Sequence, residues 1–530
     1  MQKNKITRIH VFLAAVSGIM LTASFPRTGL FWLAWFSLLP LLYALKNLPG
    51  NERFRLGLLT GLVHYLTLIY WLVHTMRTYG YLPLYLSVII LLLLSFYLAL
   101  YIAVFSVAAP ILCSKPRTLL FIGPFLWVAL EYVRSFLFSG FPWELLGYSQ
   151  YPWLSIIQIS DIAGVYGVSF LILFSNMAFF ITILHFSKKK WQNGTVSKKL
   201  AAASIFSLVL IIALSFFYGK WRITSVNKMI SESASSRIAI VQGNIEQSEK
   251  WDDKFRRSTT EKYIDLSMKL SSDKPELVVW PETATPFYFF YDPVLSQMVL
   301  DSIQETDAYF LIGSPSFVRN GRIAEYYNSA YLISPDGIPF GKYDKAHLVP
   351  FGEYVPLRRW LPFIGKIVAG VGDFMPGPKG NVLEWKDAHL GVLICYEMIF
   401  PELSRAMVKN NASLLLNITN DAWYGVSSAP YQHFSMAVFR AVENKRTLIR
   451  SANTGISGFI HPTGRIMAKT GIFQDATLTK TVPVLKEISF YTRYGDIFAL
   501  LCSIVCAITL LSQIKKSAIN KNSKKKLMVL

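Results

Sequence analysis

Long apolar runs at both ends of the chain enclose a more polar central part. Because the apolar core of a bilayer needs about 20 residues per helix, eight such runs predict membrane-spanning helices. They lie at roughly 9–25, 29–45, 56–75, 84–112, 118–138, 163–186, 200–218 and 496–513. The first run lacks a small-residue cleavage site and six further spans follow it before the polar central part, so we do not interpret it as a cleavable signal peptide. We expect a domain of seven spans in 1–218, and an eighth span with a basic tail in 492–530.

The pattern changes in residues 219–491, where short apolar runs alternate with segments of helical character. Seven runs predict buried strands: 237–245, 276–283, 308–315, 327–334, 389–397, 412–421 and 446–453. Four segments between them predict helices: 255–270, 293–305, 401–410 and 432–444. Apolar strands separated by helices are typical of a layered α/β domain. We therefore expect 219–491 to form one extramembrane α/β domain.

The formal net charge of +21 lies mainly in the apolar parts of the chain. Residues 1–218 and 492–530 together hold 23 basic and 5 acidic residues, which account for +18 of the +21. A nucleic-acid-binding protein would instead concentrate basic residues on a folded surface. The central part, at +3, has no such excess, so we expect no nucleic-acid partner.

The basic residues of the apolar parts alternate between neighbouring loops. If the N-terminus is placed inside, the inner segments carry 19 Lys and Arg residues, whereas the short outer loops hold only Arg27, Arg77 and Arg134. The inner residues are Lys3, Lys5, Arg8, Lys46, Arg53, Arg55, Lys115, Arg117, Lys188, Lys189, Lys190, Lys198, Lys199, Lys515, Lys516, Lys521, Lys524, Lys525 and Lys526. By the positive-inside rule, this asymmetry predicts that both termini are cytoplasmic and that 219–491 lies on the outer side.

Three residues near the ends of predicted strands are candidates for covalent catalysis. Of the four cysteines, only Cys395 lies in the polar central part. Glu282 follows the apolar run "LVVWP", and Lys345 lies between two further predicted strands. A carboxylate can take the proton of a thiol to create a nucleophile, and a fixed ammonium can stabilise the oxyanion that forms. Taken singly, each residue has a simpler interpretation: an inert buried thiol, a cap carboxylate and a surface charge.

The motifs around these residues are more specific than the residues themselves. "WPETATP", "YDKAHLVPFGEYVP", "ICYEMIFPE" and "NDAWYG" occur in this order along the chain. They resemble the motifs of the nitrilase superfamily, whose Glu-Lys-Cys triad they carry. With seven apolar runs before them and one after, the whole chain resembles the membrane-embedded branch of that superfamily, the apolipoprotein N-acyltransferases. The resemblance implies an αββα sandwich for 219–491 beside a membrane α-helical bundle of about eight spans.

The resemblance also implies roles for individual residues. Cys395 would be the nucleophile, Glu282 the general base and Lys345 the cation that stabilises the oxyanion. Residues that support the site or bind substrate would be Glu353, Tyr396, Glu397 and Trp251. Two alternatives stay open at this point: Trp251 as a packing aromatic, and Glu397 as a structural hydrogen-bond acceptor.

The reaction implied by the resemblance is a ping-pong acyl transfer. Cys395 would take a fatty acyl chain from a phospholipid as a thioester, and would pass it to the α-amine of an S-diacylglyceryl-cysteine at the N-terminus of an apolipoprotein. The expected location is the bacterial inner membrane, with the catalytic domain in the periplasm. We expect a monomer without a cofactor or metal ion, since no phosphate-binding loop follows a strand and no Cys/His cluster has ligand spacing.

Two other functions remain compatible with these features. A membrane-tethered amidase of the nitrilase type would use the same triad with water as the acceptor. A non-catalytic membrane receptor would use the fold without the chemistry. The spans disfavour the amidase, because a soluble substrate needs no membrane domain, and the intact triad disfavours the receptor.

Two segments outside the motifs are candidates for substrate access. Glu131 and Arg134, with the loop 140–153, place charge and tryptophan side chains beside the membrane. Charge there is often functional, whereas tryptophans also serve as interfacial anchors. Residues 358–378 combine apolar side chains with glycines, which predicts an arm that gates the site, with an ordinary connecting loop as the alternative.

Overall fold

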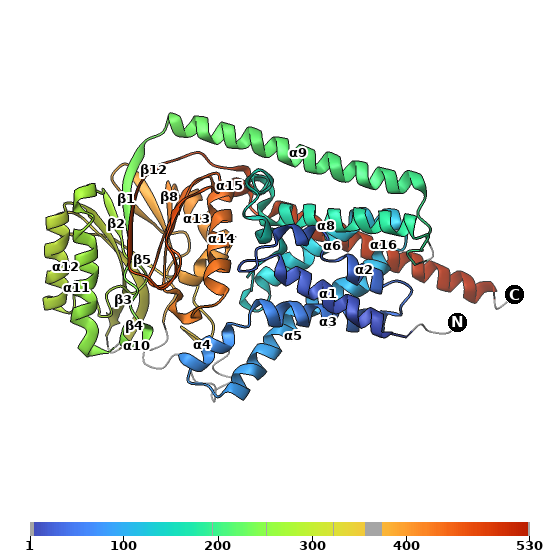
Figure 1. Cartoon of the computed structure of the whole chain (residues 1–530), viewed down its shortest axis with the longest axis horizontal. Helices are drawn as coiled ribbons and strands as arrows, with labels where there is room; N and C mark the ends of the chain where they lie inside the picture. The colour runs from blue at the N-terminus through green and yellow to red at the C-terminus, as the bar shows by residue number, and fades with distance from the viewer. Residues whose placement is uncertain (1–4, 193, 251, 322, 356–373, 528–530) are drawn as a thin grey trace. The chain divides into compact units, whose positions relative to one another are not determined.

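The computed structural model describes residues 5–192, 194–250, 252–321, 323–355 and 374–527. The chain divides into two compact units (Figure 1). The helical unit comprises Met1–Tyr70, Ile89–Gly219 and Asp496–Leu530, and the sandwich unit comprises Trp71–Val88 and Lys220–Gly495. The candidate residue Trp251 and most of the predicted arm at 358–378 lie outside the described residues.

The helical unit consists mainly of long α-helices. Its α-helices are α1 (Arg8–Ala23), α2 (Leu39–Ala44), α3 (Gly50–Leu68), α5 (Leu84–Leu112), α6 (Pro116–Phe136), α7 (Leu154–Ile157), α8 (Ser160–Phe186), α9 (Lys198–Ser231) and α16 (Ile497–Leu527), of which α2 and α7 are short. Helices α5 and α9 each include residues assigned to the sandwich unit at one end. Among the described residues, five of the helices, α5, α6, α8, α9 and α16, are long and apolar enough to cross a membrane. A sixth span results if α3 is counted together with α4 (Leu72–Thr78), to which it is joined by a bend of 51°.

The first two apolar runs form shorter helices than their hydropathy predicts. Helix α1 has 16 residues, and the run 29–45 is divided between a 3₁₀ helix (Phe31–Trp35) and α2. Pro40 lies in the first turn of α2. Proline lacks a backbone N–H and its ring clashes with the preceding turn, so a helix that began at Phe31 could not run through Pro40 undisturbed. By length and composition the structure therefore supports five or six spans, with two shorter apolar helices before them.

Glycines allow α3 and α5 to approach closely. A Cβ atom on Gly61 would lie 2.6 Å from the Cα atom of Ala99, and one on Gly57 would lie 2.8 Å from the Cα atom of Ala103. Lipid is as apolar as a leucine side chain, so helices in a membrane associate through close van der Waals packing of small residues. This pair of helices is packed in that way.

The sandwich unit contains two six-stranded sheets. In the first sheet the order is β12 (Ala476–Pro483), β1 (Ser235–Gln242), β2 (Leu277–Val279), β3 (Tyr309–Asn320), β4 (Ile323–Ile333) and β5 (Pro339–Asp344). In the second it is β11 (Ile466–Lys469), β10 (Gly458–Ile460), β9 (Thr447–Ala452), β8 (Leu414–Thr419), β7 (Ala388–Ile394) and β6 (Val382–Trp385). All seven strands predicted from the sequence are present, and the five others were not predicted.

Helices cover the outer face of each sheet, which makes four layers. Figure 1 shows α11 (Arg256–Met268) and α12 (Pro293–Thr306) on the first sheet, and α13 (Pro401–Lys409) and α14 (Ala429–Asn444) on the second. The predicted αββα sandwich is therefore confirmed. Between α11, α12 and the first sheet lies an apolar core that includes fully buried Phe310 and Val299.

Parallel pairing sets the position of the candidate residues. Strand β2 is parallel to β1 and β3, and β8 is parallel to β7 and β9. Parallel strands end at the same edge of a sheet, which is where α/β folds place their sites. Glu282 follows β2 and Cys395 follows β7, so both lie just beyond carboxyl ends of strands. Lys345 follows β5 directly.

We expect the core beneath α11 and α12 to be essential for stability. Phe310→Ala removes a fully buried ring and should destabilise the sandwich unit by about 3–5 kcal/mol. Thermal melting of the purified protein, followed by tryptophan fluorescence, measures the effect. The matched control is Ile338→Ala, at a side chain that is 60% exposed. An equal loss in both variants would contradict this assignment of the core.

Candidate active site

Cys395 lies on a strained turn between β7 and the 3₁₀ helix Cys395–Ile399. Its φ angle is +53°, which is uncommon for a residue other than glycine and marks stored backbone strain. The residue is only 6% exposed. The His433 Nε2 atom lies 3.2 Å from the carbonyl oxygen of Cys395. The turn is thus held by a side chain of α14 (Ala429–Asn444).

The His433 ring is itself fixed by two charged groups. Its Nδ1 atom lies 3.0 Å from Arg450 Nη2 and 3.2 Å from Asp421 Oδ1. A carbonyl oxygen can only accept, so the contact with Cys395 requires a proton on Nε2, and in a neutral ring Nδ1 then accepts from Arg450. Burial and the positive charge of Arg450 lower the pKa of His433, which agrees with a neutral ring.

Glu282 is held by two hydrogen bonds to its carboxylate. Asn328 Nδ2 donates to Oε1 at 2.8 Å, and the backbone N–H of Asn420 donates to Oε2 at 2.9 Å. The next residue, Thr283, has a φ angle of +46°. A Cβ atom on Gly313 would lie 2.8 Å from the Cα atom of Glu282, so β3 can pass this turn only with glycine there.

Lys345 lies between two carboxylates. Its Nζ atom is 3.9 Å from Glu282 Oε1 and 2.9 Å from Glu353 Oε1. Glu353 is fixed in turn, because its Oε2 accepts from the backbone N–H of Val349 at 2.8 Å and its Oε1 accepts from Asn328 Nδ2 at 3.0 Å. Asn328 therefore bridges both carboxylates that face the lysine.

The electrostatics keep the thiol protonated and the lysine charged. Burial raises the pKa of Cys395 above its ordinary value, the charge of Glu282 raises it further, and Lys345 opposes them. Burial alone would lower the pKa of Lys345, but the charges of Glu353 and Glu282 outweigh it and raise that pKa. A free thiolate is thus not the resting form, and the proton has to leave the thiol as the sulfur attacks.

Glu397 connects the cysteine turn to the segment that follows the lysine. Its Oε2 accepts from the N–H of Ile394 at 2.7 Å, and its Oε1 accepts from the N–H groups of Ala346 at 2.7 Å and His347 at 3.0 Å. The Tyr343 hydroxyl donates to both oxygens. Burial raises the pKa of this carboxyl to about 7, although its backbone hydrogen bonds oppose the shift. These contacts give Glu397 a structural role.

Tyr396 is buried beside two other rings. Its ring packs at a steep angle against Phe400 with centroids 5.1 Å apart, and lies 6.1 Å from the ring of His347. The hydrogen-bonding residues Asn328, Asn420 and His433 were not singled out from the sequence. Of these, only Asn420 stands in one of the quoted motifs, "NDAWYG".

The sandwich unit has a cleft with a volume of about 1500 Å³. Its lining includes Tyr79, His74, Trp423 and Gln247. Gln247 Oε1 accepts from Asn420 Nδ2 at 2.5 Å, which links the cleft to the hydrogen-bond network of Glu282. Within the described ranges, no group of three or more His, Cys, Asp or Glu side chains is placed to share a metal ion.

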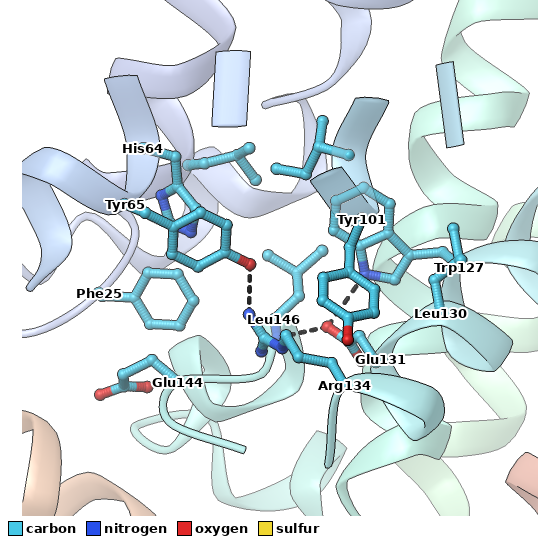
Figure 2. Close-up of a pocket in the computed structure, with 12 residues that line it drawn as sticks. Phe25, His64, Tyr65, Tyr101, Trp127, Leu130, Glu131, Arg134, Glu144 and Leu146 are labelled. Atoms are coloured by element: carbon cyan, nitrogen blue, oxygen red, sulfur yellow. Dashed lines mark hydrogen bonds between the residues drawn. The ribbon is translucent and has the colours of Figure 1, made fainter. Parts of the chain in front are cut away.

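The charged pair predicted for substrate access lies in a different, much smaller cavity of the helical unit (Figure 2). Glu131 Oε1 accepts from Trp127 Nε1 at 3.0 Å and from the backbone N–H of Leu146 at 2.8 Å, and Arg134 donates to the Tyr65 hydroxyl. The cavity volume is about 20 Å³, enough for about one water molecule. In this conformation Glu131 joins the loop 140–153 to α6, and the cavity has no room for an acyl chain.

Comparison with known proteins identifies the family. Residues 17–178 match the apolipoprotein N-acyltransferase N-terminal domain, and residues 237–487 match the carbon-nitrogen hydrolase family. An apolipoprotein N-acyltransferase of Geobacter metallireducens is 43% identical over 97% of both chains. The chain belongs to the apolipoprotein N-acyltransferase family. A second relative of that name, from Wigglesworthia glossinidia brevipalpis, is 32% identical over 94% of this chain and 97% of its own.

The solved structures that resemble the chain are more distant. A variant of the Nesterenkonia AN1 amidase from the nitrilase superfamily is 20% identical, with a TM-score of 0.36, and covers 47% of this chain and 90% of its own. Membership of the acyltransferase family makes the chain a membrane enzyme with a carbon-nitrogen hydrolase fold. Neither the amidase nor the receptor alternative is favoured by these relatives.

We expect Glu397→Gln to disturb both turns that it joins. An amide places an NH₂ group against N–H donors that now bind a carboxylate oxygen, so at least one hydrogen bond is lost. The loss should lower stability on the order of 2 kcal/mol and reduce acyl transfer. Melting temperature and transfer rate are measured together, with Glu384→Gln, an exposed residue of β6, as the control. A fully active and stable variant would show that the carboxylate is dispensable.

Proposed function

We propose that the chain transfers a fatty acyl chain from a phospholipid to the N-terminal α-amine of the S-diacylglyceryl-cysteine of apolipoproteins, through a thioester on Cys395. The observation that carries the proposal is the buried cluster of Cys395, Glu282 and Lys345, in a chain of this acyltransferase family. All three residues come from one chain, so a monomer contains the complete cluster. The proposed location is the bacterial inner membrane, with the sandwich unit in the periplasm.

In the first half-reaction, Cys395 attacks the ester carbonyl of the phospholipid. Glu282 takes the thiol proton as the carbon–sulfur bond forms, and the ammonium of Lys345 stabilises the developing oxyanion. The ester carbon–oxygen bond then breaks, and the departing alkoxide takes the proton from Glu282. The products are a thioester on Cys395 and a lysophospholipid.

In the second half-reaction, the α-amine of the lipoprotein cysteine attacks the thioester carbonyl. Glu282 accepts a proton from the amine and returns it to the sulfur as the carbon–sulfur bond breaks. The acyl chain leaves as an amide, and the thiol is restored. Glu353 and Asn328 keep Lys345 and Glu282 in position throughout, because Glu353 binds the Lys345 ammonium and Asn328 binds both carboxylates.

Burial suits this chemistry in two ways. The side chains of Lys345 and Glu282 are 1% and 8% exposed, so their charges act in a medium where electrostatic interactions are strong. Exclusion of water also protects the thioester from hydrolysis, which would convert the transferase into an esterase. The same triad with free access of water would be an amidase.

Mass spectrometry tests the covalent step. After incubation with phospholipid, we expect an acyl mass on the peptide that contains Cys395, and none in Cys395→Ala. Cys395→Ser should also be inactive, because a carboxylate is a weak base for a serine hydroxyl. Glu282→Gln and Lys345→Met should bind phospholipid but form the thioester several orders of magnitude more slowly, on the order of 10³-fold. Transfer by folded Cys395→Ala would exclude the mechanism.

Reporter fusions test the topology. With 19 basic residues in the inner segments, we expect a reporter that is active only in the cytoplasm to give signal after Lys526 and none near Ser233. A periplasm-specific reporter at the same two positions is the matched control and should give the reverse pattern. Cytoplasmic signal near Ser233 would overturn the orientation.

A further inference from the structure

The turns that carry the candidate base and the candidate nucleophile are built alike. A residue with positive φ lies on each turn: Thr283 at +46°, directly after Glu282, and Cys395 itself at +53°. In both turns, the carbonyl of the reactive residue faces a buried side-chain donor. For Cys395 that donor is His433, and for Glu282 it is Lys250, whose Nζ atom donates to the carbonyl at 2.9 Å.

Lys250 has no part in the proposed proton transfers, although it is as buried as Lys345. Each of the two lysines is 1% exposed. Burial lowers the pKa of Lys250 to about 8, while the charges of Glu282 and Cys395 act in the opposite direction. A buried ammonium is costly to maintain, and an apolar residue would fill the space more cheaply. The cost of burying the Lys250 ammonium therefore indicates that its hydrogen bond to Glu282 has a function.

The hydrogen bond from Lys250 fixes the orientation of the peptide plane between Glu282 and Thr283. The carbonyl of Glu282 and the nitrogen of Thr283 belong to one rigid plane. Rotation of that plane changes φ of Thr283, which is held in a region that a β-branched residue rarely adopts. A donor on the carbonyl fixes the plane, so it holds the strained angle and the direction in which the Glu282 side chain leaves the backbone.

The short helix that carries Lys250 is itself tied to the site. Helix α10 (Gln247–Lys250) binds Asn420 through Gln247, and Asn420 donates to the Glu282 carboxylate. Ahead of it, Ile245 exchanges two backbone hydrogen bonds with the Asn453 side chain, at 2.9 and 2.8 Å. One segment thus holds Glu282 at its carbonyl directly and at its carboxylate through Asn420.

We propose that Lys250 is a positioning residue for acyl transfer, which orients Glu282 by holding its carbonyl in the strained turn. The inference rests on the proposed function, because it assigns Glu282 a proton to move. Lys250 acts through Glu282 and touches neither substrate. Its loss should therefore slow the chemical step and leave phospholipid binding unchanged.

The test measures thioester formation on Cys395 as a function of phospholipid concentration. We compare the wild-type protein with Lys250→Met, which removes donor and charge, and with Lys250→Gln, which keeps a buried polar group but shortens the donor. We expect the rate at saturating phospholipid to fall about tenfold to a hundredfold, and KM to stay within about twofold. The matched control, Lys254→Met, changes an exposed lysine four positions further on and should behave as wild type.

A double variant tests the physical cause. Glycine adopts positive φ without strain, so Thr283→Gly should need the donor less. We expect Lys250→Met to lower the rate by a smaller factor in the Thr283→Gly background than in the wild-type background. Equal factors in the two backgrounds would mean that Lys250 acts by another route and would overturn the proposal.

Other results for the Lys250 variants would also overturn the proposal. A saturating rate equal to wild type in either folded Lys250 variant overturns the positioning role, as does a loss confined to KM. If Lys250→Met does not fold, as judged by its melting temperature, Lys250→Gln decides the question alone. Failure of the wild-type protein to form a thioester would instead reject the proposed function, so the two failures are distinguishable.

Discussion

The interaction on which the site depends is the buried contact of the Lys345 ammonium with the carboxylates of Glu282 and Glu353. Charges taken out of water are stable only when they are paired and hydrogen-bonded. Asn328 and the backbone N–H groups of Val349 and Asn420 supply further hydrogen bonds to these carboxylates. Removal of Lys345 would leave two carboxylates without a cation between them in a dry environment. The same arrangement raises the pKa of the lysine, so that a permanent cation faces the place where an oxyanion would form.

Around this cluster, buried side chains hold the backbone as well as the reactive groups. Glu397 binds the N–H groups that precede Cys395 and follow Lys345, whereas His433 and Lys250 face the carbonyls of the two strained turns. A strained backbone conformation persists only where several surrounding contacts hold it in place. These buried polar contacts thus hold the two turns with positive φ angles, which carry the thiol and the carboxylate.

Helix α4, at the end of the apolar run 56–75, belongs to the sandwich unit and packs on its turn 422–425. Thr75 in α4 donates to the carbonyl of Trp423 at 2.8 Å, and Tyr79 donates to that of Ala422 at 3.0 Å. A Cβ atom on Gly425 would lie 2.5 Å from the His74 ring, so this turn fits α4 closely. Residues from the N-terminal part of the chain therefore contact the turn that follows Asn420, and Asn420 itself binds Glu282.

The sequence by itself determined the elements and the class of fold. Apolar runs predicted the long helices of the helical unit, although they overestimated the number of spans. Seven strands and four helices of the sandwich unit were predicted by their patterns, and the motifs indicated the family. Local patterns predict helices and strands because each element buries its own apolar face, and this leaves a periodic pattern in its sequence. Four of the five strands that were not predicted, β5, β6, β11 and β12, lie at sheet edges, where a strand is less buried and its apolar pattern is weaker. Only the tertiary structure decided the partners of the reactive residues. Lys250 lies 32 positions from Glu282, and Ala346 lies 51 positions from Glu397. Hydrogen bonds of this span depend on how strands pair and which turns meet at one sheet edge, and no local pattern encodes that geometry.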